Sequence, residues 1–373
     1  VEIIVIDDGS ADRTSAIVRE AFGHDPRVRL LTLENGGKAR ALNQGLAVAK
    51  GDVIVALDAD TRFEPDTIAK LAQWFADPTI GAVAGNAKIG NRVNWLTKWQ
   101  SSEYITAQNL ERRALEALGA VTVVPGAVGA WRRAALDEVG GYPSDTLAED
   151  QDLTIAVQRA GWRVACENDA IAWTEAPETV RALFRQRYRW AFGTLQCLWK
   201  HASIIGRGQP RGLAWFGLPQ AWLFQIVLGL LSPIIDLALI VGLVDAGLRT
   251  INHGWGVMAH DLTLMVAFWL VFSSVECACG ALAYRIDGRE GRLPLLRMLA
   301  MRFGYRQLLY VVVVHAVASA LHGIKVRWGA QQRSGNAMNN EAPPLPQTVS
   351  QFSSITAGLS TDPGEKAEPP LPA

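Results

Sequence analysis

The most informative segment of the chain reads Val53-Ile54-Val55-Ala56-Leu57-Asp58-Ala59-Asp60. An uninterrupted apolar run of this length predicts a strand that is buried on both faces, as in a sheet covered by helices. Residues two apart on an extended chain point the same way, so Asp58 and Asp60 are expected to face one ligand. Open α/β sheets bind ligands at the carboxyl ends of their strands, where these two acids lie.

The paired acids allow two interpretations. Two carboxylates suit a hard divalent cation that also bridges phosphate oxygens. Alternatively, the segment is a capped turn in which Asp60 is the N-cap and Pro65 opens a helix over Pro65–Phe75. The other motifs of the chain decide between the two.

Composition limits the class of protein. The chain has 373 residues, enough for two or three domains, and carries 36 Lys and Arg against 36 Asp and Glu. This balance argues against a nucleic-acid partner. The hydrophobic fraction of 49% and the mean hydropathy of +0.11 fit a chain that is partly embedded in a membrane.

Two strand–turn–helix units precede the paired acids. A strand over Val1–Ile6 ends in Asp7-Asp8-Gly9-Ser10 and is followed by a helix over 14–22, which indicates either a ligand corner or a capped turn. A strand over Val28–Leu33 leads into Asn35-Gly36-Gly37-Lys38 and a helix over Ala39–Ala49. The two glycines permit close backbone approach and Lys38 carries a point charge, so this turn is a candidate phosphate site, although its spacing is not that of a Walker loop.

Two later helices carry further candidates. A helix over Leu147–Ala160 opens with Glu149, Asp150 and Asp152. Acids favour a first helical turn for dipole reasons alone, but Asp150 becomes a candidate general base if it faces the same cleft as Asp60. A helix over Thr179–Lys200 contains Gln186-Arg187-Tyr188-Arg189-Trp190, which suits either a membrane surface or a sugar acceptor beside a diphosphate. The remaining predictions are strands over Ile80–Gly85, Trp162–Cys166 and Ile171–Trp173, helices over Trp95–Leu118 and Trp131–Val139, and a turn at Pro125-Gly126-Ala127 close to substrate.

Taken together, these motifs resemble the processive family 2 glycosyltransferases, a group that includes the synthases of poly-N-acetylglucosamine, chitin, hyaluronan and cellulose. The resemblance is strongest to the bacterial poly-β-1,6-N-acetylglucosamine synthase type and covers about Val1 to Trp328. It rests on Asp7-Asp8-Gly9-Ser10, Gly37-Lys38-Ala39, Asp58-Ala59-Asp60, Glu149-Asp150 and Gln186–Trp190 in this order. The implied fold is α/β, a GT-A-like doubly wound mixed sheet followed by transmembrane helices.

The resemblance implies a role for each motif residue. Asp8 contacts the uracil of a UDP-sugar, Asp7 supports that corner, and Lys38 lies near the nucleotide. Asp58 and Asp60 hold the diphosphate through Mg²⁺ or Mn²⁺, and Asp150 deprotonates the acceptor hydroxyl. Gln186, Arg189 and Trp190 line the acceptor end, with Arg189 on the leaving diphosphate. Such a displacement inverts the anomeric carbon.

The start of the chain departs from the family pattern. The family fold opens with a strand and an Asn-Glu-rich turn that helps to hold uridine, and this piece would precede Val1. We therefore expect a fragment whose N-terminal strand and part of whose donor site are missing.

The second half of the chain predicts membrane helices. Leu213–Val244, broken by Pro219 and Pro233, is interpreted as an interfacial helix followed by a span, with further spans over Leu262–Tyr284 and Leu308–Ile324. Glu276 within the second span is expected to face protein or a polar path, and Cys277 and Cys279 are expected to be thiols. Six arginines between the second and third spans place that loop in the cytoplasm with the catalytic domain: Arg285, Arg289, Arg292, Arg297, Arg302 and Arg306. Lys325, Arg327 and Arg333 follow the third span, although an odd number of spans would put them outside.

The predicted domains are a glycosyltransferase domain over 1–200, a membrane region over 201–330 and a disordered tail over 331–373. The leading hypothesis is a multi-pass enzyme of the inner (plasma) membrane that adds N-acetylglucosamine from a UDP-sugar to a growing β-linked polysaccharide, as in biofilm formation. Export of the polymer would involve a deacetylase or an export subunit as partner. The alternatives are transfer of a single sugar to a lipid and a non-catalytic membrane subunit.

Overall fold

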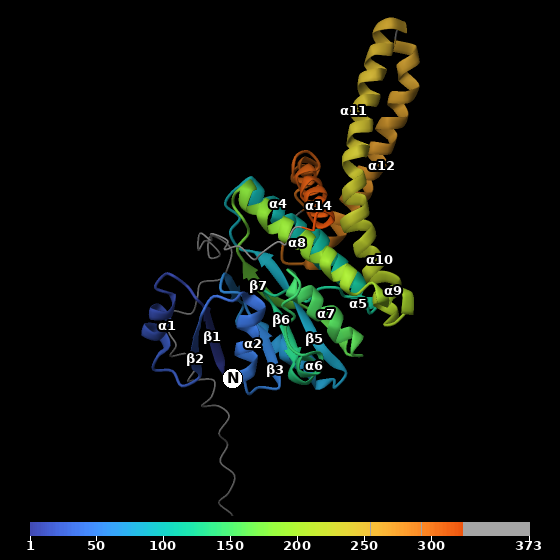
Figure 1. The fold of residues 1–373 in the computed structure, drawn as a ribbon. Helices are drawn as coiled ribbons and strands as arrows, with labels where there is room; N and C mark the ends of the chain where they lie inside the picture. The colour runs from blue at the N-terminus through green and yellow to red at the C-terminus, as the bar shows by residue number, and fades with distance from the viewer. Residues whose placement is uncertain (254, 292, 324–373) are drawn as a thin grey trace, which may run out of the picture.

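The computed structural model describes residues 1–253, 255–291 and 293–323. The first 200 residues form an α/β unit, and a helical hairpin extends away from it (Figure 1). The predicted tail over 331–373 and the basic residues Lys325, Arg327 and Arg333 lie outside the described residues.

The α/β unit contains two sheets. β1 (Ile3–Asp8) and β2 (Val28–Leu33) pair in parallel and are connected by α1 (Thr14–Phe22). The other sheet has the order β3-β6-β5-β7-β4, with bounds of Val53–Ala56, Gly129–Arg132, Ile80–Ile89, Arg163–Thr174 and Thr61–Phe63. β5 and β7 are parallel, whereas the other pairs are antiparallel, so this sheet is mixed as predicted. The sheet is split, because β1 is not hydrogen-bonded to β3 among the described residues.

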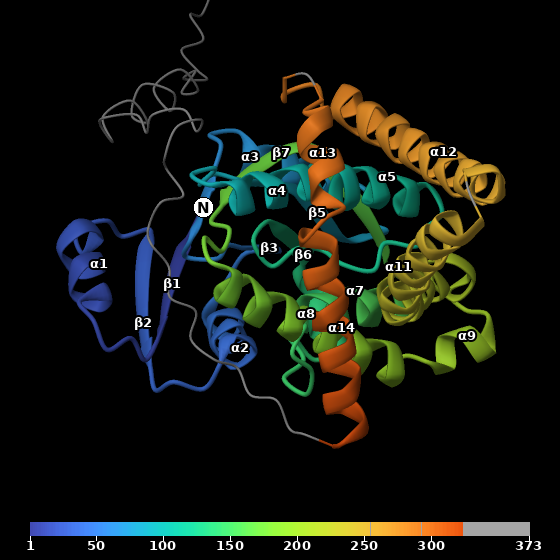
Figure 2. The ribbon, with the colours of Figure 1, turned by 90° about the horizontal axis from the view of Figure 1, so that it is seen from above.

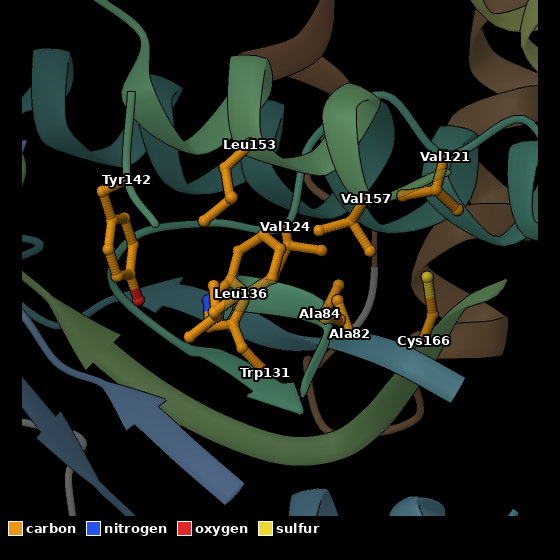
Figure 3. Close-up of a cluster of buried hydrophobic side chains, with 11 residues drawn as sticks. Ala82, Ala84, Val121, Val124, Trp131, Leu136, Tyr142, Leu153, Val157 and Cys166 are labelled. Carbon is orange, nitrogen blue, oxygen red and sulfur yellow. The ribbon is translucent and has the colours of Figure 1, made fainter. Parts of the chain in front are cut away.

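Helices cover both faces of the larger sheet, which confirms the predicted doubly wound α/β arrangement. On one face, α2 (Lys38–Val48), α6 (Arg133–Val139) and α7 (Glu149–Arg159) enclose a core built around Trp131 and Leu153 (Figure 3). On the other face, α3 (Thr67–Ala72) and the short helix η1 (Gln73–Ala76) pack Leu71 and Phe75 on the sheet. Val53 and Val55 belong to this second core and Ile54 to the first, as expected for a strand buried on both sides.

Three predicted elements differ from the structure, and in the first two strand pairing overrides local sequence preference. The predicted helix over Trp131–Val139 begins only at Arg133, since Trp131 pairs with Ile54 and Ala82 in β6. The two short strands expected over 162–173 are one strand, β7, which follows β5 through two register shifts. The helix predicted over Pro65–Phe75 begins at Thr67, with Asp66 and not Asp60 at its N-cap position.

A layer of long helices lies between the larger sheet and the membrane-type helices (Figure 1). It contains α4 (Trp95–Glu103), the π-helical turn η2 (Tyr104–Asn109) and α5 (Leu110–Ala117), followed by α8 (Val180–Lys200). Thr179 caps α8 by accepting a hydrogen bond from the Ala182 N–H at 3.2 Å. The short helix α9 (Ser203–Arg207) then leads to the membrane-type helices.

The segment predicted as an interfacial helix followed by a span is helical without interruption. η3 (Leu213–Gly217), α10 (Leu218–Gln220), η4 (Ala221–Val227) and α11 (Leu228–His253) follow one another without a gap. Two of these segments are π-helical, and such wide turns accommodate backbone groups that lose their usual partners near Pro219. The chain also continues in helical form through Pro233.

In the described part of the chain, three helices are long and apolar enough to cross a membrane: Leu213–Arg249, Thr263–Asp287 and Leu295–Leu321. α12 (Trp255–Asp287) forms a hairpin with α11, and α13 (Leu295–Met301) and α14 (Tyr305–Leu321) follow. α14 crosses over α8 (Figure 2), where the ring of His315 lies 5.1 Å from that of Tyr188. Glu276 faces protein, as expected, because it pairs with Arg302 at 3.2 Å and with Arg306 at 2.8 Å.

The end of α12 and the loop that follows it are bound to the α/β unit by three ion pairs, of which the first is buried. Lys88 of β5 pairs with Asp287 at 2.7 Å, and both side chains are almost fully buried. Arg92 pairs with Glu290 at 2.5 Å, and Arg289 of the same loop pairs with Glu64 at 3.0 Å. Arg289 therefore lies beside the α/β unit, whereas Arg285, Arg297 and Arg306, predicted in the same loop, lie within α12, α13 and α14.

Candidate active site

A cleft of about 1690 Å³ brings together most of the side chains predicted from sequence. It extends from the edges of β1 and β3 past the N-termini of α2 and α7 to α8, η2 and η4. The predicted site residues that line it are Asp8, Lys38, Asp58, Asp60, Asp150, Gln186, Arg189 and Trp190. Asp7 is buried and does not line it.

The paired acids are held by a turn and not by an extended strand. β3 ends at Ala56, and the Thr61 N–H donates to the Asp58 carbonyl at 3.0 Å, which reverses the chain into β4. The prediction that strand alternation orients Asp58 and Asp60 is therefore wrong, although both residues line the cleft. The capped-turn alternative is also wrong in assigning Asp60 as the N-cap of the next helix.

Lys38 is the cationic centre of the cleft. Its ammonium lies 2.7 Å from Asp58 Oδ1 and 3.1 Å from Glu149 Oε1. Burial opposes its charge, but the carboxylates of Asp58, Glu149 and Asp150 outweigh that effect and raise the pKa of Lys38 above its ordinary value. This lysine is charged and links the paired acids to the N-terminus of α7.

Glu149 and Asp150 have different environments although they are adjacent. Glu149 is buried, and burial raises its pKa despite the neighbouring Lys38. Asp150 Oδ2 accepts a hydrogen bond from the Gly126 N–H at 3.2 Å, and its Oδ1 accepts one from the Gln151 N–H at 2.9 Å. A Cβ atom at Gly126 would lie 2.6 Å from Lys38 Nζ, so a side chain there would require the end of Lys38 to shift. The turn at Pro125-Gly126-Ala127 thus forms part of the cleft wall.

The acids at the end of β1 stabilise two turns. Asp8 accepts hydrogen bonds from the N–H groups of Gly36 and Gly37, both at 2.9 Å. Asp7 accepts from the Ser10 N–H at 2.8 Å and from the Ser15 hydroxyl, and these bonds lower the pKa of Asp7. The carboxylate of Asp8 thereby fixes the glycine turn that precedes Lys38.

α8 presents polar and aromatic groups to the cleft. The Oε1 atom of Gln186 is buried and has no hydrogen-bond partner among the described residues. Buried polar groups are normally hydrogen-bonded, so this oxygen is an exception in the wall of the cleft. Trp190 lies one turn further on, close to the guanidinium of Arg187.

One wall of the cleft is formed by residues that were not among the predicted site residues. The helix predicted over Trp95–Leu118 contributes Glu103, Tyr104, Gln108, Glu111 and Arg112 to this wall. The spacing of Tyr104, Gln108 and Glu111 by four and three residues was the available signal, since it places polar groups on one helix face. The π-helical turn there widens the helix, as such turns often do at functional sites.

The donor atoms fit a divalent cation only in part. Asp58 and Asp60 supply hard carboxylate oxygens, but no group of three potential ligands from His, Cys, Asp and Glu occurs in the described ranges. A cation that keeps water or substrate phosphate oxygens as further ligands needs no more than one or two protein carboxylates. The residues present therefore fit a metal that binds together with a phosphorylated ligand.

Comparison with known proteins identifies relatives of the chain. The model of the glycosyl transferase family group 2 matches residues 53–273. Poly-beta-1,6-N-acetyl-D-glucosamine synthase of Staphylococcus aureus (strain COL) is 35% identical over 193 residues, which are 52% of this chain and 47% of that protein. The Staphylococcus epidermidis protein of the same name is 34% identical over 194 residues. The chain spans about half the length of these curated relatives.

The fold also has a solved counterpart. The mannosyltransferase PcManGT from Pyrobaculum calidifontis, determined in complex with GDP-Man and Mn²⁺, superimposes with a TM-score of 0.51 at 22% identity. The match covers 87% of this chain and 79% of the other, and it confirms the GT-A-like fold. The family model spans more than half of the chain and contains the Asp58–Asp60 turn, Asp150 and the Gln186–Trp190 segment. The chain therefore belongs to glycosyl transferase family group 2.

Proposed function

We propose that the protein transfers a sugar from a UDP-sugar to a growing β-linked polysaccharide at the membrane, with inversion, and that the sugar is N-acetylglucosamine. The observation that carries this proposal is the single cleft that contains Lys38, the paired acids, Asp150 and the Gln186–Trp190 segment. The choice of sugar is supported by the similarity to staphylococcal poly-beta-1,6-N-acetyl-D-glucosamine synthases.

Asp150 is the general base of the proposed reaction. Its carboxylate accepts two backbone hydrogen bonds, which orient it while leaving lone pairs directed at the cleft. The acceptor hydroxyl gives its proton to Asp150 as its oxygen forms a bond to the anomeric carbon. The bond from that carbon to the diphosphate oxygen breaks at the same time, and the electron pair leaves with UDP. Attack opposite to the leaving group converts an α-linked donor into a β-linked product.

Charge neutralisation at the leaving group is divided between several residues. Asp58 and Asp60 would hold Mg²⁺ or Mn²⁺ together with the diphosphate, and the cation would supply Lewis-acid stabilisation of the departing charge. Lys38, already 2.7 Å from Asp58, keeps the carboxylates in place and adds positive charge near the nucleotide. Arg189 extends the cationic lining toward the acceptor side. Asp8, with Asp7 behind it, forms the corner for the uracil base.

The acceptor end is assigned to α8. Trp190 offers a flat apolar face to a sugar ring, and the amide side chain of Gln186, one turn earlier on the helix, lines the same part of the cleft. The cleft continues past η2 to Gln225 on η4, at the base of α11. Its volume exceeds the roughly 300–1,000 Å³ of typical small-ligand sites, which favours an extended acceptor over a single small molecule.

The domain division and membrane placement complete the proposal. Residues 1–200 form the catalytic domain, and the region from 201 onward attaches it to the plasma membrane in several passes. The ion pairs of Lys88 with Asp287 and of Arg92 with Glu290 keep the end of α12 and the following loop beside the catalytic domain, and the positive-inside rule assigns the arginines on either side of this loop to the cytoplasm. A deacetylase or an export subunit is the expected partner for the emerging polymer.

Product size tests the proposal. Membranes that contain the protein are incubated with radiolabelled UDP-N-acetylglucosamine, and the product is sized and digested with linkage-specific glycosidases. A polymer of β-linked N-acetylglucosamine is expected. A lipid-extractable product carrying one sugar would instead support single transfer, and absence of turnover with every UDP-sugar would support a non-catalytic subunit.

A further inference from the structure

A largely buried cluster of three residues from three helices lies at the acceptor end of the cleft. Arg187 of α8 binds Glu103, the last residue of α4, through two parallel hydrogen bonds of 3.0 and 2.6 Å. The hydroxyl of Tyr305, the first residue of α14, donates to the same carboxylate at 2.5 Å. Arg187 is 8% exposed and Tyr305 is 3% exposed. A bidentate pair of this kind fixes the plane of the guanidinium as well as its position.

The fixed guanidinium in turn contacts Trp190. Its central carbon lies 4.5 Å from the centroid of the indole ring, within the range of a cation–π contact. The two residues are three apart on α8, so their side chains lie on one face of the helix. Glu103, Arg187 and Trp190 all line the cleft. The orientation of the indole therefore depends on a residue of α8 that is itself held by α4 and α14.

The arrangement is more than a generic stabilising pair. Arg187 is buried, and although burial opposes its charge, Glu103 outweighs that effect and raises the pKa of Arg187 above its ordinary value. A neutral packing residue at position 187 would fill the same space without orienting a neighbouring ring. The two tryptophans of α8 differ in this respect. Trp190 lines the cleft beside Arg187, whereas Trp199 is 79% exposed and does not line the cleft.

We propose that Glu103 and Tyr305 are positioning residues for the acceptor sugar, and that they act on Trp190 through Arg187. This inference rests on the proposed role of Trp190 as the platform under an acceptor ring. A side chain that is already oriented before the ligand binds loses less conformational entropy on binding. The acceptor therefore binds with higher affinity. Because Tyr305 begins α14, the acceptor end of the catalytic domain is also tied directly to the membrane-facing helices.

The test separates acceptor binding from donor binding. Glu103→Gln keeps the size of the side chain but removes its charge, and Tyr305→Phe removes only one hydroxyl. Initial rates are measured with UDP-N-acetylglucosamine against varied concentrations of a short β-linked N-acetylglucosamine oligosaccharide, and UDP affinity is measured separately. For Glu103→Gln we expect kcat/KM for the acceptor to fall about tenfold, the scale of a desolvated cation–π contact, with UDP affinity unchanged. Tyr305→Phe should give a smaller loss in the same direction.

A double-mutant cycle shows whether the effect passes through the tryptophan. In a Trp190→Ala background, Glu103→Gln should cause less than about a twofold further loss, because the ring it orients is gone. Equal losses in both backgrounds would overturn the inference. Arg92→Gln is the matched control, since it breaks another largely buried ion pair, with Glu290, away from the cleft. It should lower the thermal midpoint while leaving the acceptor kcat/KM at the wild-type value.

The outcomes also separate this inference from the proposed function. If Trp190→Ala leaves the acceptor kinetics unchanged, the acceptor site itself is misplaced. If Trp190→Ala impairs acceptor use but Glu103→Gln and Tyr305→Phe do not, only the positioning role fails. Should Glu103→Gln prove too unstable to purify, Tyr305→Phe decides alone, and wild-type acceptor kinetics in that variant would refute the inference.

Discussion

Asp150→Asn is the sharpest test of the proposed chemistry. The substitution preserves the shape of the side chain but removes its basicity. The carboxylate accepts hydrogen bonds from the N–H groups of Gly126 and Gln151, and the single carbonyl oxygen of asparagine can keep one of them. The expected structural cost is thus one exchanged hydrogen bond, about 1 kcal/mol.

The kinetic cost should be much larger. General base catalysis typically contributes about 10²–10⁴-fold, which corresponds to roughly 2.7–5.5 kcal/mol at about 1.36 kcal/mol for each tenfold change. We expect kcat to fall by at least this factor, while UDP binds no more weakly than to the wild type, because a base acts only on the reacting hydroxyl. The assay combines initial rates of sugar transfer, UDP affinity and the thermal midpoint of each variant.

Asp152→Asn provides the control. Asp152 lies two residues further along α7 but points away from the cleft, where His201 and Lys200 bind it at 2.7 and 2.8 Å. Its substitution should lower the thermal midpoint and leave kcat near the wild-type value. If Asp150→Asn retains turnover within tenfold of the wild type, the base lies elsewhere, and Glu149 is the next candidate.

Three further predictions follow from the same geometry. EDTA should abolish sugar transfer and Mg²⁺ or Mn²⁺ should restore it, while Asp60→Asn should weaken UDP binding only when metal is present; full activity in EDTA would contradict the metal site. A cysteine at Gly291, in a background without Cys277 and Cys279, should resist a membrane-impermeant maleimide in intact cells and react after permeabilisation, and labelling of intact cells would reverse the proposed orientation. Burial opposes ionisation of Asp152, but its hydrogen bonds with His201 and Lys200 outweigh this effect and lower its pKa in the folded protein. The stability that this carboxylate contributes is therefore fully present above its pKa in the unfolded chain, about 4, and is lost as the pH falls through its lower pKa in the folded protein. The thermal midpoint of Asp152→Asn should accordingly depend less on pH in the acid range than that of the wild type, and parallel curves would disprove this.

The motifs were predictable from sequence because each depends on local order. A strand such as Val28–Leu33 and a helix such as Thr14–Phe22 carry their period and end signals in their own residues, and the structure has them with those bounds. The apolar run before Asp58 is similarly local, since a strand buried on both faces requires apolar residues at every position. The order of the charged motifs along the chain was sufficient to indicate the family.

The tertiary structure alone decided how these motifs meet. Strand pairing with β5 turned Trp131 from a predicted helix into β6, and a hydrogen-bonded turn, rather than strand alternation, placed Asp58 and Asp60 beside Lys38. Tyr305 contacts Glu103 and Arg187, which lie 202 and 118 positions before it in the sequence. Contacts over such distances depend on how whole helices pack, and no local pattern in the sequence specifies the orientation of one helix against another.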